Sequence, residues 1–113
     1  MTIVYHNPKC RKSRAGLEYV KTRCNEPIVK EYIREGISVS ELKDLVALLG
    51  LKPYDLVRIQ EDYFKEHLKG KELTDEEWLN VLSENPRLIK RPIVVHNQQA
   101  VIADPATNVE TIL

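Results

Sequence analysis

The sequence predicts a mixed α/β fold built on a four-stranded sheet. Three observations lead to this prediction. A strand, a helix and a second strand follow one another within the first 33 residues, in the order of a right-handed βαβ unit. Helical patterns fill the middle of the chain. Two runs rich in β-branched residues return near the C-terminus, ahead of a last helix.

The first third of the chain supplies the βαβ unit. Thr2–Tyr5 is rich in β-branched and aromatic residues and is stopped by an Asn-Pro pair, which is typical of a buried strand that ends in a turn. Residues 11 to about 24 contain no proline and have apolar residues at helical spacing, so we expect a helix there. Residues 27–33 are the candidate for the second strand.

The middle of the chain is expected to be helical. A helix over residues 41–49 has four aliphatic side chains on one face, and Ser38 or Ser40 can cap it. Pro53 suits the first turn of a short helix. Residues 74–77 form a capping box before a further helix, which a second Asn-Pro pair ends.

The C-terminal third returns to strands. Residues 92–96 and 100–103 are strand candidates, and residues 97–98 form a tight turn between them. Asp104 is expected to cap the last helix, with Pro105 at its first position. The whole order is therefore β-α-β, helices, β-β-α. A thioredoxin-like fold satisfies this order, with residues 1–113 as a single domain and a helical insertion at about residues 38–90.

Composition excludes several classes of protein. Lysine plus arginine number 17, as do aspartate plus glutamate, so the formal net charge is zero and a dedicated nucleic-acid binder is disfavoured. No apolar run approaches the roughly 20 residues that cross a bilayer, and no signal peptide is visible. Two cysteines and three scattered histidines indicate neither a disulfide scaffold nor a metal site. We expect a cytoplasmic protein without a bound metal.

Cys10 stands where the first strand gives way to the first helix. Backbone N–H groups and the helix dipole create positive potential at such a place. The neighbouring residues Lys9, Arg11, Lys12 and Arg14 are all basic. A thiol in this setting is expected to have a pKa below 7.5 and to react as a thiolate.

Three further side chains belong to this candidate site. Ser13 and Arg14 follow Cys10 by three and four residues, on its side of the helix. Ser13 can donate a hydrogen bond to the sulfur or to a substrate. His6 could add positive charge, move a proton or serve only as a hydrogen-bonded structural residue. Arg14 is a candidate ligand for an anion or a solvated residue.

Cys24 is a poor partner for Cys10. Fourteen residues of helix place their backbones about 21 Å apart, whereas a disulfide needs Cα atoms within about 7 Å. Ser13 also stands where a dithiol motif would have its second cysteine. The sequence therefore predicts that an external thiol, such as glutathione or a glutaredoxin, resolves any adduct at Cys10.

Two blocks of sequence resemble the ArsC family of glutaredoxin-linked arsenate reductases. The first is residues 5–10 followed by Ser13 and Arg14, and the second is residues 88–95. The resemblance extends over essentially the whole chain. It implies that the Cys10 thiolate attacks arsenate, that glutathione displaces the adduct as As(V) becomes As(III), and that glutaredoxin regenerates the thiol. Glutathione would be a co-substrate, and no cofactor would stay bound.

The resemblance also assigns roles to single residues. His6 and Ser13 match the family's residues around the cysteine, while Arg58 and Arg91 match two of its three oxyanion-binding arginines. Arg91 precedes a proline at the position of the family's cis-proline bond. Arginine suits this role because it forms bidentate bonds with tetrahedral oxyanions and stays charged. The family has its third arginine just before the proline of the last helix. This chain has Asp104 at that position, so the third arginine is missing.

Two other functions compete with arsenate reduction. A redox protein that exchanges with glutathione mixed disulfides needs the thiolate but not three arginines, and Asp104 favours it slightly. Regulators of the Spx type have this fold and bind RNA polymerase, but they commonly carry a Cys-x-x-Cys switch, and Ser13 argues against that function here.

Overall fold

The computed structural model describes all residues, Met1–Leu113, and divides them into two compact units. The sheet unit comprises Met1–Gly36 and Arg91–Leu113, and the helical unit comprises Ile37–Lys90. The expectation of one domain with an insertion at about residues 38–90 stays a prediction. No helix is both long and apolar enough to span a lipid bilayer.

The sheet unit contains the four-stranded mixed sheet that the sequence predicts. Its strand order is β2-β1-β3-β4. The central strand β1 is parallel to β2 and antiparallel to β3, and β3 continues into β4 as a hairpin. The bounds are Thr2–Tyr5 for β1, Ile28–Lys30 for β2, Ile93–His96 for β3 and Gln99–Ile102 for β4.

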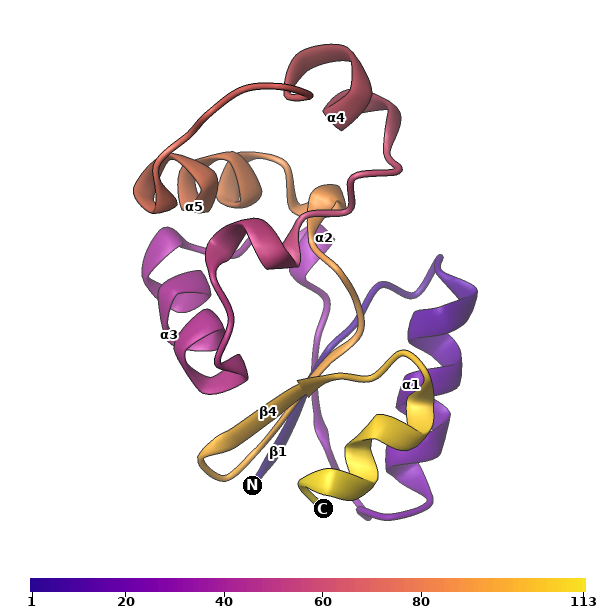
Figure 1. Ribbon diagram of the computed structural model, residues 1–113. Helices are drawn as coiled ribbons and strands as arrows, with labels where there is room; N and C mark the ends of the chain where they lie inside the picture. Colours follow the sequence, from indigo (N-terminus) through magenta and orange to yellow (C-terminus); the bar gives the residue numbers. More distant parts are fainter. The chain divides into compact units, whose positions relative to one another are not determined.

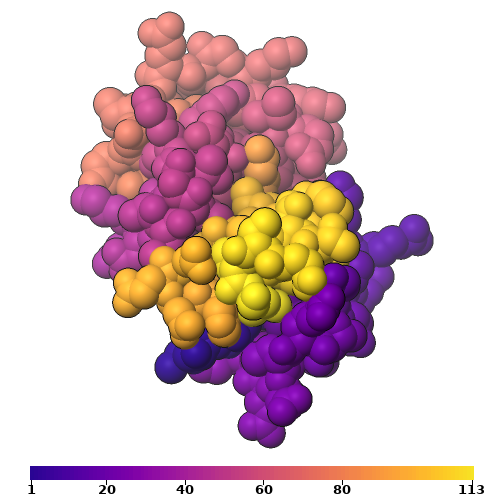
Figure 2. All heavy atoms as spheres, turned by 60° about the horizontal axis from the view of Figure 1, so that its bottom comes forward, coloured from indigo at the N-terminus to yellow at the C-terminus, as the bar shows by residue number.

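One side of this sheet carries the core of the unit. Helix α1 (Arg11–Lys21) and the C-terminal 3-10 helix η3 (Ala106–Thr111) lie on that side, as Figure 1 shows. Figure 2 shows η3, in yellow, against the violet of the N-terminal part. The buried core residues come from both helices and the strands: Val4, Leu17, Val20, Val94, Ala103, Val109 and Ile112.

The second predicted strand is shorter than expected. Only Ile28–Lys30 pair with β1, and Tyr32–Glu35 form a single helical turn, α2, instead of continuing the strand. The Glu35 carboxylate accepts a hydrogen bond from the backbone N–H of Glu31 at 2.9 Å, which supports the start of this turn. The β-branched and aromatic composition of residues 27–33 predicts a strand throughout this range. That prediction is wrong for the end of the range, where α2 begins.

The helical unit follows most of the predicted pattern. Ser38 caps α3 by accepting from the backbone N–H of Glu41 at 3.1 Å, and Thr74 and Glu77 form the predicted capping box of α5. The short helix at Pro53 is a 3-10 helix, and α4 was not predicted. The bounds are Val39–Leu49 for α3, Pro53–Leu56 for η1, Asp62–His67 for α4, Asp75–Glu84 for α5 and Pro86–Leu88 for η2.

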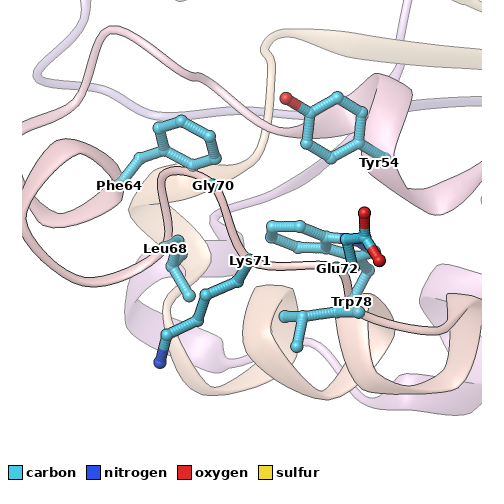
Figure 3. Close-up of a pocket in the computed structure, with 8 residues that line it drawn as sticks. Tyr54, Phe64, Leu68, Gly70, Lys71, Glu72 and Trp78 are labelled. Atoms are coloured by element: carbon cyan, nitrogen blue, oxygen red, sulfur yellow. The ribbon is translucent and has the colours of Figure 1, made fainter.

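An open aromatic pocket of about 520 Å³ lies within the helical unit. The Tyr54 and Trp78 rings meet there with their centroids 5.0 Å apart, and Phe64 lies 6.4 Å from each. Figure 3 shows the Lys71 side chain extending away from these rings. Packing between the three aromatic rings thus joins η1, α4 and α5.

Candidate active site at Cys10

The turn between β1 and α1 holds Cys10 at the N-cap of the helix. Asn7 shapes the turn, because its carbonyl accepts from the Cys10 N–H at 3.0 Å and its side chain accepts from the Lys9 N–H at 3.1 Å. The Cys10 carbonyl accepts the first helical hydrogen bond, from the Arg14 N–H at 2.9 Å. The cysteine side chain therefore sits beside the unpaired N–H groups of the first helical turn.

The environment of the Cys10 sulfur favours the thiolate. Burial alone raises the pKa of this thiol, but hydrogen bonds from the Ser13 backbone and the Arg91 side chain, the Arg91 charge and a hydrogen bond from the Lys12 backbone outweigh it. The pKa is therefore lowered from its ordinary value. The Arg91 Nε lies 3.1 Å from the sulfur and donates to it. This direction agrees with the activated cysteine that the sequence predicts.

His6 and Ser13 form a buried pair beneath the turn. The Ser13 hydroxyl lies 2.8 Å from the His6 Nδ1 and accepts from the Asn7 N–H, also at 2.8 Å. Ser13 is fully buried. Burial lowers the pKa of His6, so the imidazole is neutral at neutral pH. The contacts of the two side chains hold the turn in place, and the Ser13 backbone N–H faces the sulfur.

Arg91 is followed by Pro92, which contacts both the end of strand β4 and helix α1. The Arg91–Pro92 peptide bond is cis, and the Pro92 carbonyl accepts from the Ala103 N–H at 2.8 Å. Helix α1 approaches this proline closely at Gly16, where a Cβ atom would lie 2.5 Å from the Pro92 Cγ. The sequence reasoning missed Gly16. A glycine inside a predicted helix was the signal that could have indicated such a close approach.

The basic residues around Cys10 have different surroundings. The Arg14 Nη1 donates to the Pro8 carbonyl at 2.9 Å, so this side chain folds back over the turn. The Lys12 Nζ lies 3.1 Å from a carboxylate oxygen of Asp104. Lys9 and Arg11 are exposed. Roles for Arg14, His6 and Ser13 in binding or catalysis stay predictions.

Asp104 does not cap the last helix, which corrects the sequence prediction. The helix η3 begins at Ala106 with Pro105 as its N-cap, and no side chain caps it. The Asp104–Pro105 bond is cis, and Asn108 instead donates to the Asp104 carbonyl at 3.3 Å. The Asp104 carboxylate is therefore free of the helix and pairs with Lys12.

Arg58 belongs to the helical unit, and its place in the site stays a prediction. Its side chain donates to the Arg87 carbonyl at 3.0 Å and pairs with Glu61 at 3.1 Å. Its Nε is buried and has no hydrogen-bond partner. A donor left unpaired in this way is available to an acceptor that binds later.

Both cysteines are free thiols. Cys24 lies three residues beyond the end of α1 and packs against the core of the sheet unit. This place agrees with the predicted packing role of Cys24. No group of three or more histidine, cysteine or acidic residues could hold a metal ion.

Fold and site together define a thiol protein of thioredoxin-like architecture with one activated cysteine. The chain matches the model of the ArsC family over residues 5–112 and belongs to that family. It is 38% identical to the uncharacterized Escherichia coli protein YfgD, with 94% of this chain and 91% of that one covered. It is 35% identical to the arsenate reductase of Neisseria meningitidis, with 97% and 96% covered. The solved structure of an arsenate reductase from Vibrio cholerae is 39% identical with a TM-score of 0.93, with 99% and 97% covered.

Proposed function

We propose that this chain reduces arsenate, with the Cys10 thiolate as nucleophile and glutathione and glutaredoxin as the source of electrons. The observation on which the proposal rests is the contact between the Arg91 Nε and the Cys10 sulfur at 3.1 Å, at the start of a helix. A guanidinium placed there stabilises the thiolate and can also bind a tetrahedral oxyanion. The arsenate reductases among the relatives support the choice of substrate.

The proposed reaction balances without a bound cofactor. The Cys10 thiolate attacks As(V), a sulfur–arsenic bond forms, and a protonated arsenate oxygen leaves as water. A glutathione thiolate then attacks the Cys10 sulfur, and the sulfur–arsenic electron pair stays on arsenic, which leaves as arsenite. The glutaredoxin thiolate attacks the glutathione sulfur of the mixed disulfide and releases the Cys10 thiolate. Two thiols are thereby oxidised and one As(V) is reduced.

The other residues have supporting roles in this proposal. Arg91 binds the oxyanion. Arg58 and Arg14 are further ligands of the same oxyanion. His6 and Ser13 hold the turn so that the Ser13 N–H keeps facing the sulfur. A reducing compartment such as the cytoplasm would keep both cysteines as free thiols. Neither a membrane nor a nucleic acid takes part.

A coupled assay tests the proposal. Purified protein, glutathione, glutaredoxin, a glutathione reductase and NADPH are mixed with and without arsenate. We expect arsenate-dependent oxidation of NADPH. Cys10→Ser should abolish this oxidation. Cys24→Ser should leave it intact, because Cys24 packs against the core and takes no part in the proposed reaction. NADPH oxidation that needs no Cys10, or none above background, would refute the proposal.

A second function is favoured by one observation. The carboxylate of Asp104, at the place of the family's third arginine, pairs with Lys12 and so removes positive charge from the first turn of α1. Exchange with glutathione mixed disulfides needs no oxyanion site. Arsenate-independent reduction of a glutathionylated peptide, at a rate that exceeds arsenate turnover, would support this function instead.

A further inference from the structure

The Cys10 sulfur is open to small molecules and has one uncommitted cation in contact with it. Cys10 is only partly buried. Its sulfur accepts hydrogen bonds from the backbones of Ser13 and Lys12 and from the Arg91 Nε at 3.1 Å. The contact with sulfur is the only hydrogen bond of the Arg91 side chain, and no acidic residue pairs with it. The two terminal nitrogens of this guanidinium are therefore available to an acceptor beside the sulfur.

Three other cationic side chains of the predicted site already have partners. Arg14 donates to a backbone carbonyl of the turn, and the Lys12 ammonium lies 3.1 Å from the Asp104 carboxylate. Arg58 belongs to the helical unit and pairs with a glutamate there at 3.1 Å. Arg91 alone has its charge both unpaired and in contact with the sulfur. A single cation of this kind suits a neutral substrate on which one negative charge develops during the reaction.

Hydroperoxides are substrates of that kind. They are uncharged at neutral pH, and cleavage of their O–O bond places a negative charge on the leaving oxygen. A thiolate is the nucleophile that such a bond requires, and its oxidation product is a sulfenic acid. Because a guanidinium holds its donors in one plane, Arg91 can keep its Nε on the sulfur while a terminal nitrogen binds the leaving oxygen.

We propose that Cys10 reduces hydroperoxides and that Arg91 stabilises the oxygen that leaves. The Cys10 thiolate attacks the terminal oxygen of the hydroperoxide, a sulfur–oxygen bond forms, and the O–O bond breaks. The leaving alkoxide takes a proton from water and becomes an alcohol, while the attacked oxygen stays on sulfur as the hydroxyl of the sulfenic acid. The sulfur loses two electrons, and the peroxide gains them.

The sulfenic acid has no thiol partner within the chain. Cys24 lies beyond the other end of α1 and packs against the core of the sheet unit. An external thiolate therefore attacks the sulfenic sulfur, a disulfide forms, and the hydroxide that leaves is protonated to water. A second thiolate then cleaves this mixed disulfide and releases Cys10. The inference rests on the proposed function only for the choice of glutathione and glutaredoxin as these thiols.

A single-turnover experiment tests the first step without arsenate or any added thiol. Reduced Cys24→Ser protein, which has one thiol, is mixed with hydrogen peroxide, and the sulfenic acid is trapped with dimedone and measured by mass spectrometry. The rate constant of alkylation by iodoacetamide is measured on the same protein. The ratio of the peroxide rate constant to the alkylation rate constant is independent of the Cys10 pKa, because both reactions start from the thiolate. Free glutathione gives the ratio of a thiolate without a protein site.

We expect the ratio for Cys10 to exceed the ratio for free glutathione by about tenfold or more, the scale of one preorganised donor at a developing charge. Arg91→Lys in the same background should lower it by about tenfold, because an ammonium keeps the charge but loses the planar set of donors. Lys9→Gln is the control, since Lys9 is exposed and adjacent to Cys10 but does not contact the sulfur. Its ratio should stay at the value of the background protein.

Turnover is measured in the coupled assay with hydrogen peroxide in place of arsenate, and the rate of Cys10→Ser is subtracted as background. We expect peroxide-dependent oxidation of NADPH above this background. A ratio no higher than that of free glutathione, equal ratios for the background protein and Arg91→Lys, no dimedone adduct at Cys10, or no turnover would each overturn the inference. If it fails while arsenate turnover persists, the proposed function survives; if peroxide is reduced and arsenate is not, only the choice of arsenate fails.

Discussion

At the scale of single residues, Arg91 has two roles, and the substitution Arg91→Lys can separate them. Its Nε donates to the Cys10 sulfur at 3.1 Å, and its charge lowers the pKa of that thiol. In the proposed reaction the same guanidinium binds the oxyanion. Lysine would keep the charge but lose the planar set of donors. The two variants Arg91→Ala and Arg91→Lys therefore report on charge and on geometry respectively.

We predict that Arg91→Ala raises the pKa of Cys10 and lowers kcat/KM for arsenate by about 10- to 100-fold, the loss of one charge-assisted hydrogen bond. Arg91→Lys should keep much of the pKa shift and little of the activity. The pH dependence of alkylation by iodoacetamide measures the first effect, and the coupled assay measures the second. The exposed Arg87 provides a control, since Arg87→Ala should change neither. An alkylation midpoint that stays put in Arg91→Ala would contradict the assignment.

Asp104 stands at the position where the resemblance to the ArsC family implies a third arginine. Because its carboxylate pairs with Lys12 and does not cap η3, its replacement should cost little stability, below about 1 kcal/mol for an exposed pair. We predict that Asp104→Arg raises kcat/KM for arsenate about tenfold by supplying a further cationic ligand. Asp104→Asn, which removes the charge without adding a donor fork, should give a smaller rise. Equal rates in the two variants would show that an arginine at position 104 does not bind the oxyanion.

At the scale of elements, α1 is held against Pro92 by the absence of a side chain at Gly16. Alanine normally stabilises a helix interior by about 1 kcal/mol relative to glycine. Here its Cβ would lie 2.5 Å from the Pro92 ring, and overpacking of that kind costs about 1–3 kcal/mol. We predict that Gly16→Ala lowers the free energy of unfolding and, by displacing Pro92 and Arg91, raises the Cys10 pKa.

Urea denaturation and alkylation rates check the two effects of Gly16→Ala. Lys21→Ala, at the exposed end of the same helix, is the control, because it changes helix propensity away from Pro92. A Gly16→Ala variant that is more stable than the wild type would mean that α1 and Pro92 do not meet as closely as the structure indicates.

The elements also show what could be predicted from the sequence. The strands β1, β3 and β4 and the helices α1, α3 and α5 have clear periodicity, caps or both, so local patterns were enough to predict them. The helix α4 was missed because its six residues bury only Phe64. At Tyr32 the apolar composition favoured a strand, while a hydrogen bond from the Glu31 N–H to the Glu35 side chain favoured a helical turn. Aspartate is a common helix cap, but the Asp104 carboxylate pairs with Lys12, which lies 92 residues away in the sequence.

The site could be predicted only in part, for a related reason. The place of Cys10 at a helix start follows from the local sequence, because a strand, a turn and a helix meet there. The contact with Arg91 spans 81 residues of chain, so no local pattern predicts it. The family resemblance indicated Arg91 as a site residue, and the suitability of arginine for binding oxyanions supported that choice. The close approach of Gly16 to Pro92 depends on the packing of α1 against the loop before β3, which no local pattern encodes.

For the whole molecule, two groups of the candidate site, His6 and Cys10, link folding to pH with the same sign. Burial lowers the pKa of His6; burial raises that of Cys10, but hydrogen bonds and the Arg91 charge outweigh it and leave it lowered too. In both cases the unfolded chain takes up the proton at a higher pH than the folded chain. Stability therefore rises with pH between the folded and the unfolded pKa of each group.

We predict that a comparison of the wild type with Cys10→Ser isolates the contribution of Cys10 to this dependence of stability on pH. Its contribution is complete above the ordinary thiol pKa of about 8.5 and is lost as pH falls through the lowered folded pKa. Cys10→Ser lacks this contribution but keeps that of His6, so the wild type should gain stability over the variant as pH rises. Urea denaturation of both proteins under reducing conditions, at steps from roughly pH 5 to 9.5, measures the difference in unfolding free energy across that thiol's titration range. A difference that does not change with pH would mean that folding leaves the Cys10 thiol as acidic as it is in the unfolded chain, and the proposed nucleophile would then owe nothing to Arg91 or to the start of α1.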